Sequence, residues 1–331
     1  MDRERPPATL PPPVGPPRGE RLVVAVADIG SHSTHLLVAA TTGHDLEPLL
    51  DVSDILALGA VVDREGYLPA AARAQLIATL VRYADTAREL GATESAFLGT
   101  EPLRIAANAA RVRAEVEAAT GVPLHVLGHQ EEARLTLLGV TGGSPLAVDL
   151  LVADVGGGST ELVLAEQGRP IRALGIALGA SRLTDALVAH DPPTANELAR
   201  LRLEAQRAFA SVPDAAPRVC VLVGGTGSNL AKVAGPDAPH RALTAGQIAG
   251  LVKAVCRYPA EQAAVRFGIR AARARVLPAG AALVTALLAR YHLPGVLVRE
   301  EGVREGAVLA IARAGAGWRD QVERLAHGWG A

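Results

Sequence analysis

Three glycine-rich segments, each preceded by a run of apolar residues, combine small residues with hydroxyl and carboxylate side chains. They read DIGSHS over residues 28–33, DVGGGST over residues 154–160 and GGTGSN over residues 224–229. Glycine lets backbone N–H groups converge on an anion without an intervening Cβ, and serine and threonine hydroxyls add donors. Asp28 and Asp154 stand where two of the apolar runs end, and such carboxylates can hold a magnesium ion. The pattern indicates phosphate binding beside a divalent cation.

A pair of adjacent carboxylates offers a second kind of chemistry. Glu131 and Glu132 open a predicted helix, and neighbouring helical residues diverge by about 100°, so at most one faces a given site. One of them could accept a proton from an attacking water, or both could simply favour the positive end of the helix dipole. Ser33 and Ser159 would need a positioned base to act as nucleophiles. Because no histidine is assigned to either serine, we interpret both as phosphate donors.

The elements that must position these residues repeat along the chain. Residues 24–39, VAVADIGSHSTHLLVA, align without gaps with residues 150–165, LLVADVGGGSTELVLA. Each copy reads as a strand, a turn and a returning strand, so the repeat indicates a duplicated architecture. Strands alternate with helices in both halves, which predicts an α/β fold. The remaining predicted strands are 96–100, 122–127, 219–223 and 295–299, and the predicted helices are 70–90, 108–120, 131–140, 194–210, 228–234, 244–257 and 278–291.

Composition limits the classes of protein that remain. The 331 residues are 49% hydrophobic and 20% charged, with a formal net charge of -1. About 150 residues per domain predicts two domains, and the balanced charge excludes a basic nucleic-acid coat. No uninterrupted apolar stretch approaches the roughly 18 residues of a membrane span. Residues 1–20 contain seven prolines and no apolar signal-peptide core, so we expect a disordered tail and a cytoplasmic protein.

Several familiar sites are excluded by local context. A Rossmann turn opens a helix, whereas residues 161–165, ELVLA, read as a strand. A Walker A loop needs Gly-Lys-Ser/Thr, and neither Lys232 nor Lys253 follows a glycine. The nine histidines show no metal-ligand spacing, and the two cysteines are too few for a disulfide framework or a zinc site.

The motifs together resemble the exopolyphosphatase/guanosine pentaphosphatase (Ppx/GppA) family of the actin–hexokinase–Hsp70 superfamily. The resemblance covers residues 22–310 and rests on DIGSHSTHLLVA, GTEPLRIAANAARV, EEARLTLLGV, LVADVGGGSTELVL, ALGASRLTDAL, VGGTGSNLAKV and EGVREG, in the family's order. It implies two ribonuclease-H-like (actin-like ATPase) domains, residues 21–141 and 142–310, facing a central cleft. A C-terminal helix over residues 311–331 would then pack back on the first domain.

The resemblance also implies a role for individual residues. Glu132 would be the general base on water, and Arg104 would clamp a phosphate. Asp154 and Glu161 would hold Mg²⁺, with Mn²⁺ as the alternative. His32 stands where the family usually has Asn. The implied phosphate-binding residues are Asp28, Gly30, Ser31, Gly156, Gly157, Gly158, Ser159, Gly225 and Thr226.

These roles imply a bacterial metal-dependent phosphohydrolase that releases terminal phosphate from inorganic polyphosphate. Guanosine pentaphosphate ends in the same phosphoanhydride bond, and the sequence does not separate the two substrates. An ATP-dependent phosphotransferase, in which GGTGSN would border adenosine, and a non-catalytic binder of polyphosphate or guanosine tetraphosphate remain alternatives. The EEARL segment favours hydrolysis, and the presence of Glu132 and Asp154 argues against a mere binder. We expect a small-molecule substrate, no nucleic-acid or membrane partner, and a homodimer as one candidate assembly.

Overall fold

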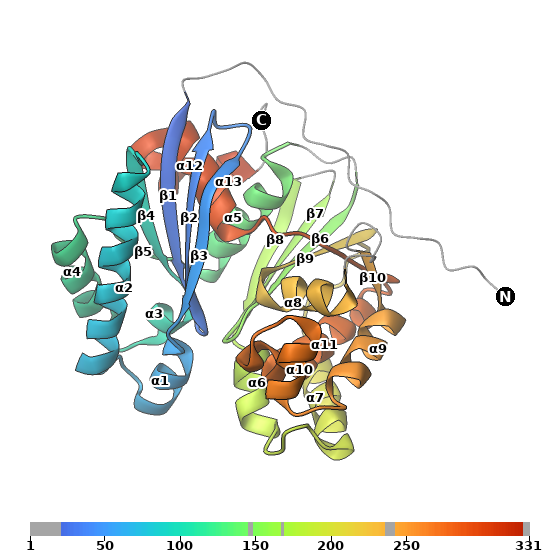
Figure 1. Ribbon diagram of the computed structural model, residues 1–331. Helices are drawn as coiled ribbons and strands as arrows, with labels where there is room; N and C mark the ends of the chain where they lie inside the picture. Colours follow the sequence, from blue (N-terminus) through green and yellow to red (C-terminus); the bar gives the residue numbers. More distant parts are fainter. Residues whose placement is uncertain (1–20, 145–147, 167–168, 236–241, 327–331) are drawn as a thin grey trace. The chain divides into compact units, whose positions relative to one another are not determined.

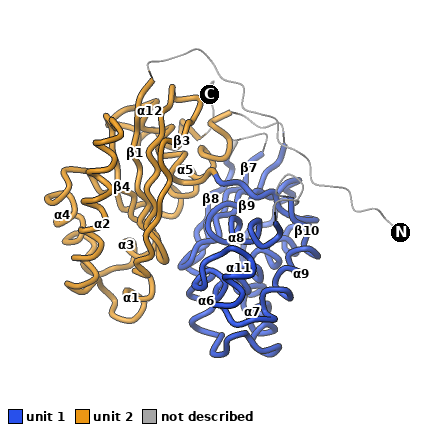
Figure 2. Tube along the Cα trace, viewed as in Figure 1, with its two compact units in different colours: residues 1–12, 146–300 blue, residues 13–145, 301–331 orange. Residues whose placement is uncertain are grey.

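The computed structural model describes residues 21–144, 148–166, 169–235 and 242–326. The chain forms two compact units (Figure 2). Unit 1 includes residues 146–300, and unit 2 consists of residues 13–145 together with 301–331. Each unit contains one β-sheet with helices packed on it (Figure 1).

The sheet of unit 2 has the strand order β3-β2-β1-β4-β5. Strands β1, β2 and β3 form an antiparallel meander, and β4 and β5 extend it in parallel with β1. This is the ribonuclease-H-like arrangement that the resemblance implied. The strands are β1 (Leu22–Ile29), β2 (Ser33–Thr41), β3 (Glu47–Ile55), β4 (Glu94–Gly99) and β5 (Leu124–Val126).

The sheet of unit 1 repeats this arrangement. Its order is β10-β11-β9-β6-β7-β8, in which β6, β7 and β8 form the meander and β9 and β11 extend it in parallel. Strand β10 adds an antiparallel edge. The two copies of the sequence repeat form the β1–β2 and β6–β7 hairpins, which confirms the predicted duplication and the α/β class. The strands are β6 (Leu150–Val155), β7 (Thr160–Glu166), β8 (Arg169–Ile176), β9 (Val219–Val223), β10 (Ala242–Thr244) and β11 (Gly295–Val298).

Alternating residues of β1 and β2 enter two different cores in unit 2. Ala27 and Leu36 belong to the core that contains apolar residues of α2 and α4. Val26 and Leu37 belong to the core shared with α5, α12 and α13. The sheet is therefore buried on both faces. The helices of this unit are α1 (Leu58–Glu65), α2 (Ala70–Glu89), α3 (Glu101–Ile105), α4 (Ala109–Thr120), α5 (His129–Thr141), α12 (Val303–Ala314) and α13 (Trp318–Ala326).

Helix α11 is the central helix of unit 1 and packs against α6, α7, α8, α9 and α10. Among the described residues it alone is long and apolar enough to cross a membrane, but 67% of its most apolar window is buried inside the protein. That environment is typical of a core helix. The helices of this unit are α6 (Ala180–Leu187), α7 (Ala195–Ala208), α8 (Gly224–Ala234), α9 (Ala245–Val255), α10 (Ala260–Phe267) and α11 (Ala271–Arg290).

Several elements differ from the sequence prediction. GGTGSN is the first turn of α8 and not a separate turn, because Gly224 starts the helix with a φ of 76° directly after β9. Helix α11 begins seven residues before Pro278, which lies buried inside it. The tight packing around α11 outweighs the backbone hydrogen bond that proline cannot donate. Strands β3 and β8 were not predicted, since edge strands lack a regular apolar alternation.

The compact units separate at residue 300, whereas the sequence placed the second domain's end at residue 310. The difference comes from α12, which packs against β1, β2 and α5 of unit 2. Two glycines permit the closest part of this packing. A Cβ on Gly139 would lie 2.1 Å from the carbonyl oxygen of Gly302, and one on Gly306 would lie 1.8 Å from that of Leu135. Helices α5 and α12 therefore touch backbone to backbone.

This contact predicts opposite effects for alanine at different helical glycines. Gly139→Ala and Gly306→Ala would force the two helices apart, and each should lower the free energy of unfolding by about 1–3 kcal/mol or more. Gly250→Ala in α9 is the matched control, because a Cβ there would meet nothing within 4 Å. It should stabilise the protein by up to about 1 kcal/mol. Urea unfolding followed by circular dichroism checks all three, and equal effects would contradict the close contact.

Candidate functional site

The first two glycine-rich segments form matching hairpin turns, one in each unit. In unit 2 the Gly30 N–H donates to the carbonyl of Ser33 at 3.1 Å. In unit 1 the Gly156 N–H donates to the carbonyl of Ser159 at 3.0 Å. The sequence repeat therefore extends to the same hydrogen bond. Helix α1 supports the first turn, since the Gly59 N–H donates to the carbonyl of Ser31 at 2.8 Å.

Two carboxylates that the resemblance assigns to a metal lie opposite each other in unit 1. Asp154 of β6 and Glu161 of β7 are register partners in the antiparallel pair, and such partners project from the same face of a sheet. Glu161 is buried, and a Cβ on Gly224 would lie 2.1 Å from Oδ1 of Asp154. Magnesium and manganese prefer carboxylate oxygens, so this pair fits a hard divalent cation.

A small pocket in unit 1 collects residues from both glycine-rich segments of that unit. Gly156, Gly157, Gly225 and Thr226 line it, together with Ser181, Asn229 and Arg273. The Thr226 hydroxyl donates to the carbonyl of Val155 at 2.8 Å and so ties α8 to β6. Two predicted phosphate ligands, Gly158 and Ser159, are not part of the lining.

The polar groups of this pocket suit an anion. Burial, with a further contribution from Arg270, lowers the pKa of Arg273 to about 10. Its Nη1 would lie 2.7 Å from a Cβ at position 225, so the glycine there leaves room for the guanidinium. The Ser181 Oγ is buried and has no hydrogen-bond partner among the residues that the structure describes. An anion bound in the pocket would favour the charged guanidinium and could accept from the hydroxyl.

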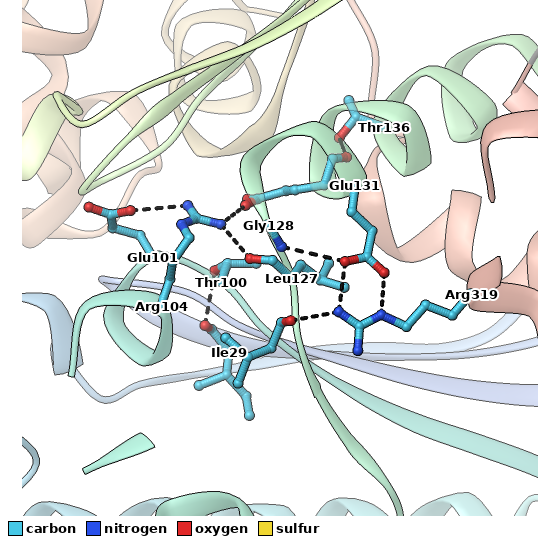
Figure 3. A network of polar contacts seen from close by, with 11 residues as sticks. Ile29, Thr100, Glu101, Arg104, Leu127, Gly128, Glu131, Thr136 and Arg319 are labelled. Carbon is cyan, nitrogen blue, oxygen red and sulfur yellow. Dashed lines mark hydrogen bonds and ion pairs between the residues drawn. The ribbon is translucent and has the colours of Figure 1, made fainter. Parts of the chain in front are cut away.

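In unit 2, Arg104 of α3 joins two carboxylates and a backbone carbonyl (Figure 3). Its Nη1 donates to Oε2 of Glu132 at 2.8 Å and to the Leu127 carbonyl at 2.8 Å. Its Nη2 donates to Oε2 of Glu101 at 3.0 Å. The side chains of Arg104, Glu132 and Glu101 are only 14%, 8% and 4% exposed. The guanidinium thus fixes the orientation of the Glu132 carboxylate at the start of α5.

The adjacent Glu131 has different partners, as the divergence of neighbouring helical residues predicts. Its carboxylate accepts from Arg319 of α13, and Oε2 accepts from the Gly128 N–H at 3.4 Å, which caps α5 (Figure 3). Arg319 also donates to the Val126 carbonyl at 2.8 Å. Glu131 therefore holds the C-terminal helix α13 against the start of α5, and Glu132 is the carboxylate of the buried network.

His129 is a further titratable group next to Glu132. One of its ring nitrogens lies within 4.8 Å of a Glu132 carboxylate oxygen. Burial lowers the pKa of His129, and the charge of Arg104 adds to that effect. A neutral imidazole at this position can accept a proton or bind a metal.

Sequence reasoning did not select Glu101, His129, Ser181 or Arg273. Glu101 lies within the motif GTEPLR and could have been identified as a partner for Arg104. The other three carry no local signal, because each acquires its neighbours only through the tertiary fold.

The Ppx/GppA phosphatase family model matches residues 37–314. This chain belongs to the Ppx/GppA phosphatase family. Exopolyphosphatase 1 of Mycobacterium tuberculosis is 32% identical over 302 residues, which are 86% of this chain and 87% of the relative. A Ppx/GppA structure from Aquifex aeolicus is 27% identical, has a TM-score of 0.76, and covers 88% of this chain and 97% of its own. An exopolyphosphatase from Cytophaga hutchinsonii has the same fold, with 18% identity, a TM-score of 0.79, and coverage of 88% and 98%.

The comparisons confirm the family and the two-domain fold of actin-like ATPases that the motifs implied. Ppx/GppA membership extends across both units, since the matched residues 37–314 contain all of residues 146–300 of unit 1 and most of unit 2. All seven motifs fall within or next to this match. The roles of individual residues remain predictions and are developed below.

The buried network predicts a large stability effect at Arg104. Arg104→Met keeps much of the bulk but leaves two buried carboxylates without their shared cation. It should lower the free energy of unfolding by about 3–5 kcal/mol. Arg88→Met is the matched control, because it breaks a pair with Asp85 whose side chains are 61% and 54% exposed. Arg88→Met should lower the free energy of unfolding by less than about 1 kcal/mol. Urea unfolding measures both, and a small effect of Arg104→Met would show that the network is not buried as described.

Proposed function

We propose that this protein is a metal-dependent phosphohydrolase that releases terminal phosphate from inorganic polyphosphate. The observation that carries the proposal is the Glu132 carboxylate, oriented by Arg104 at the start of α5 in a chain of the Ppx/GppA family. Relatives from Mycobacterium tuberculosis and Mycobacterium leprae, both named Exopolyphosphatase 1 and 32% identical, support polyphosphate as the substrate. Neither guanosine pentaphosphate hydrolysis nor phosphotransfer from ATP is favoured by these names.

Glu132 would act as the general base. Its carboxylate would accept a proton from water as the water attacks the terminal phosphorus. Such positioned proton transfer contributes typically about 10²–10⁴-fold to a rate. The ion pair with Arg104 limits the rotation of the carboxylate, so the base would be in place before substrate binds. In this reading Arg104 acts on Glu132, in addition to the phosphate contact that the resemblance implied.

The other residues would hold and neutralise the phosphate chain. Backbone N–H groups of the two hairpin turns would donate to phosphate oxygens, and the pocket with Arg273 would add a cation. Asp154 and Glu161 would hold Mg²⁺ or Mn²⁺, which neutralises charge on the transferring phosphoryl group. Because phosphoryl transfer needs little covalent help, this charge neutralisation would supply most of the catalysis. We propose that the reaction takes place in the cytoplasm.

The assignment of the base predicts different outcomes for two adjacent residues. Glu132→Gln keeps the shape of the side chain but cannot accept the proton, so kcat for phosphate release from polyphosphate should fall by about 100-fold or more. Glu131→Gln is the matched control and should change kcat by less than about tenfold, since Glu131 binds Arg319 and caps α5. Equal losses in the two variants would show that the wrong carboxylate or the wrong mechanism has been assigned.

The metal assignment predicts a requirement for a divalent cation. Phosphate release should need Mg²⁺ or Mn²⁺ and should stop in excess chelator. Asp154→Asn preserves volume but removes a ligand charge, so activity should nearly vanish. Asp214→Asn is a suitable control in the same unit, because the Asp214 side chain is 96% exposed, and its activity should match the parent protein. Full activity of the parent protein in chelator would refute the metal assignment.

A further inference from the structure

Ser33 and His35 form a hydrogen-bonded pair at the start of β2. The Nε2 of His35 lies 2.7 Å from the Oγ of Ser33. Residues two apart in a strand point to the same face, so the strand itself sets this contact. Ser33 closes the first hairpin turn, since its carbonyl accepts from the Gly30 N–H. No histidine was predicted from the sequence as a partner of Ser33, and the structure supplies His35.

The pair lies on the polar end of a sheet face that is otherwise part of a core. Further along the same face, Leu37 packs in the core that includes residues of α5 and α12. Asp28, the acidic residue of the first glycine-rich segment, is the register partner of His35 on β1. The pair is therefore adjacent to the turn that we assign to phosphate.

An ion pair between β3 and α12 lies further along the same sheet face. Asp51 of β3 is the register partner of Leu37 and accepts from Arg304 of α12 at 2.6 and 3.2 Å. Burial opposes the charge of Arg304, but Glu305, Asp51 and Asp28 outweigh it, so the pKa of Arg304 lies above its usual value. The carboxylates of Asp28, Asp51 and Glu305 thus all act on the guanidinium of Arg304.

A serine hydroxyl carries a single proton, so its partner decides what it offers a ligand. If Ser33 donates to His35, only its lone pairs remain, and these repel a phosphate oxygen. If the Nε2–H of His35 donates to Ser33, the hydroxyl proton can point at the phosphate. A fully ionised phosphate has hydrogen-bond acceptors but no donor. Only the second arrangement therefore suits a phosphate at this turn.

We propose that His35 is a positioning residue that holds Ser33 as a hydrogen-bond donor to the phosphate bound at the first turn. The proposal rests on the proposed function and deepens it, because it names a residue that increases the affinity for the substrate. His35 acts through Ser33 and not on the Glu132 base. Its loss should therefore weaken binding of ground state and transition state alike, which raises KM and leaves kcat nearly unchanged.

The test compares two replacements of His35. Gln places an amide N–H about where Nε2–H lies, so His35→Gln should keep KM for polyphosphate within about threefold of the parent protein. His35→Leu removes the donor and should raise KM about tenfold or more, which is the scale of one hydrogen bond to a charged group. Ser33→Ala should raise KM to a similar extent, and Ser33→Ala with His35→Leu should be no worse than Ser33→Ala alone.

The division of the effect between KM and kcat separates this role from a merely structural one. Loss of the donor in His35→Leu should raise KM and leave kcat nearly unchanged, whereas a general loss of packing would lower kcat as well. The control is His125→Leu, since His125 lies on β5 of the same sheet, where its ring packs edge-on against Trp318 at 5.4 Å. That variant should keep the parent KM and the parent kcat.

Equilibrium binding keeps this proposal distinct from the proposed function. Tripolyphosphate binding is measured by calorimetry for the parent protein, His35→Gln and His35→Leu. Binding with the expected order of affinities, but without any hydrolysis, would remove the proposed function and leave the role of His35 supported. Hydrolysis with equal KM in His35→Gln and His35→Leu, or additive effects of Ser33→Ala and His35→Leu, would overturn the role of His35 alone. If His35→Leu does not fold, Ser33→Ala decides, because a parent-like KM in that variant would also overturn the role of His35.

Discussion

The buried ion pair between Arg104 and Glu132 links the segments on which the proposed chemistry depends. A guanidinium removed from water is costly, and this one is stabilised by two carboxylates and the Leu127 carbonyl. These partners come from α3, from the end of β5 and from α5, so the three segments cannot shift independently of one another. The base that we assign is therefore positioned by the same contacts that hold this end of the sheet together.

The position of α5 depends in turn on the last part of the chain. Helices α12 and α13 pack against α5, and the Gly139 and Gly306 contacts set how closely they approach. Arg319 reaches from α13 to Glu131, one residue from the proposed base. The two neighbouring glutamates thus have different structural roles. Glu131 anchors α13, and Glu132 belongs to the buried network.

Much of this architecture could be predicted from the sequence because it follows from the local order of apolar and glycine residues. The hairpins at Asp28 and Asp154 follow from apolar runs broken by glycine, and the gapless repeat predicted two equivalent sheets. The start of α11 was missed because Pro278 looks like the beginning of a helix, and only the surrounding helices show that it lies inside one. Arg273 and His129 were missed for a related reason, since their environments come from segments distant in the chain. The pairing of His35 with Ser33 is local, but its meaning needed the strand geometry.

The discontinuity of unit 2 has a consequence for the order in which the protein folds during synthesis. Unit 1 is complete once residue 300 has left the ribosome, whereas unit 2 still lacks α12 and α13. Domains made during translation usually fold with the N-terminal one first. Here unit 2 cannot complete its fold before α12 and α13 have been synthesised. Until then one face of β1 and β2 is only partly covered by α5. A chain cut short after unit 1 would therefore leave apolar strand surface exposed in the half that was synthesised first.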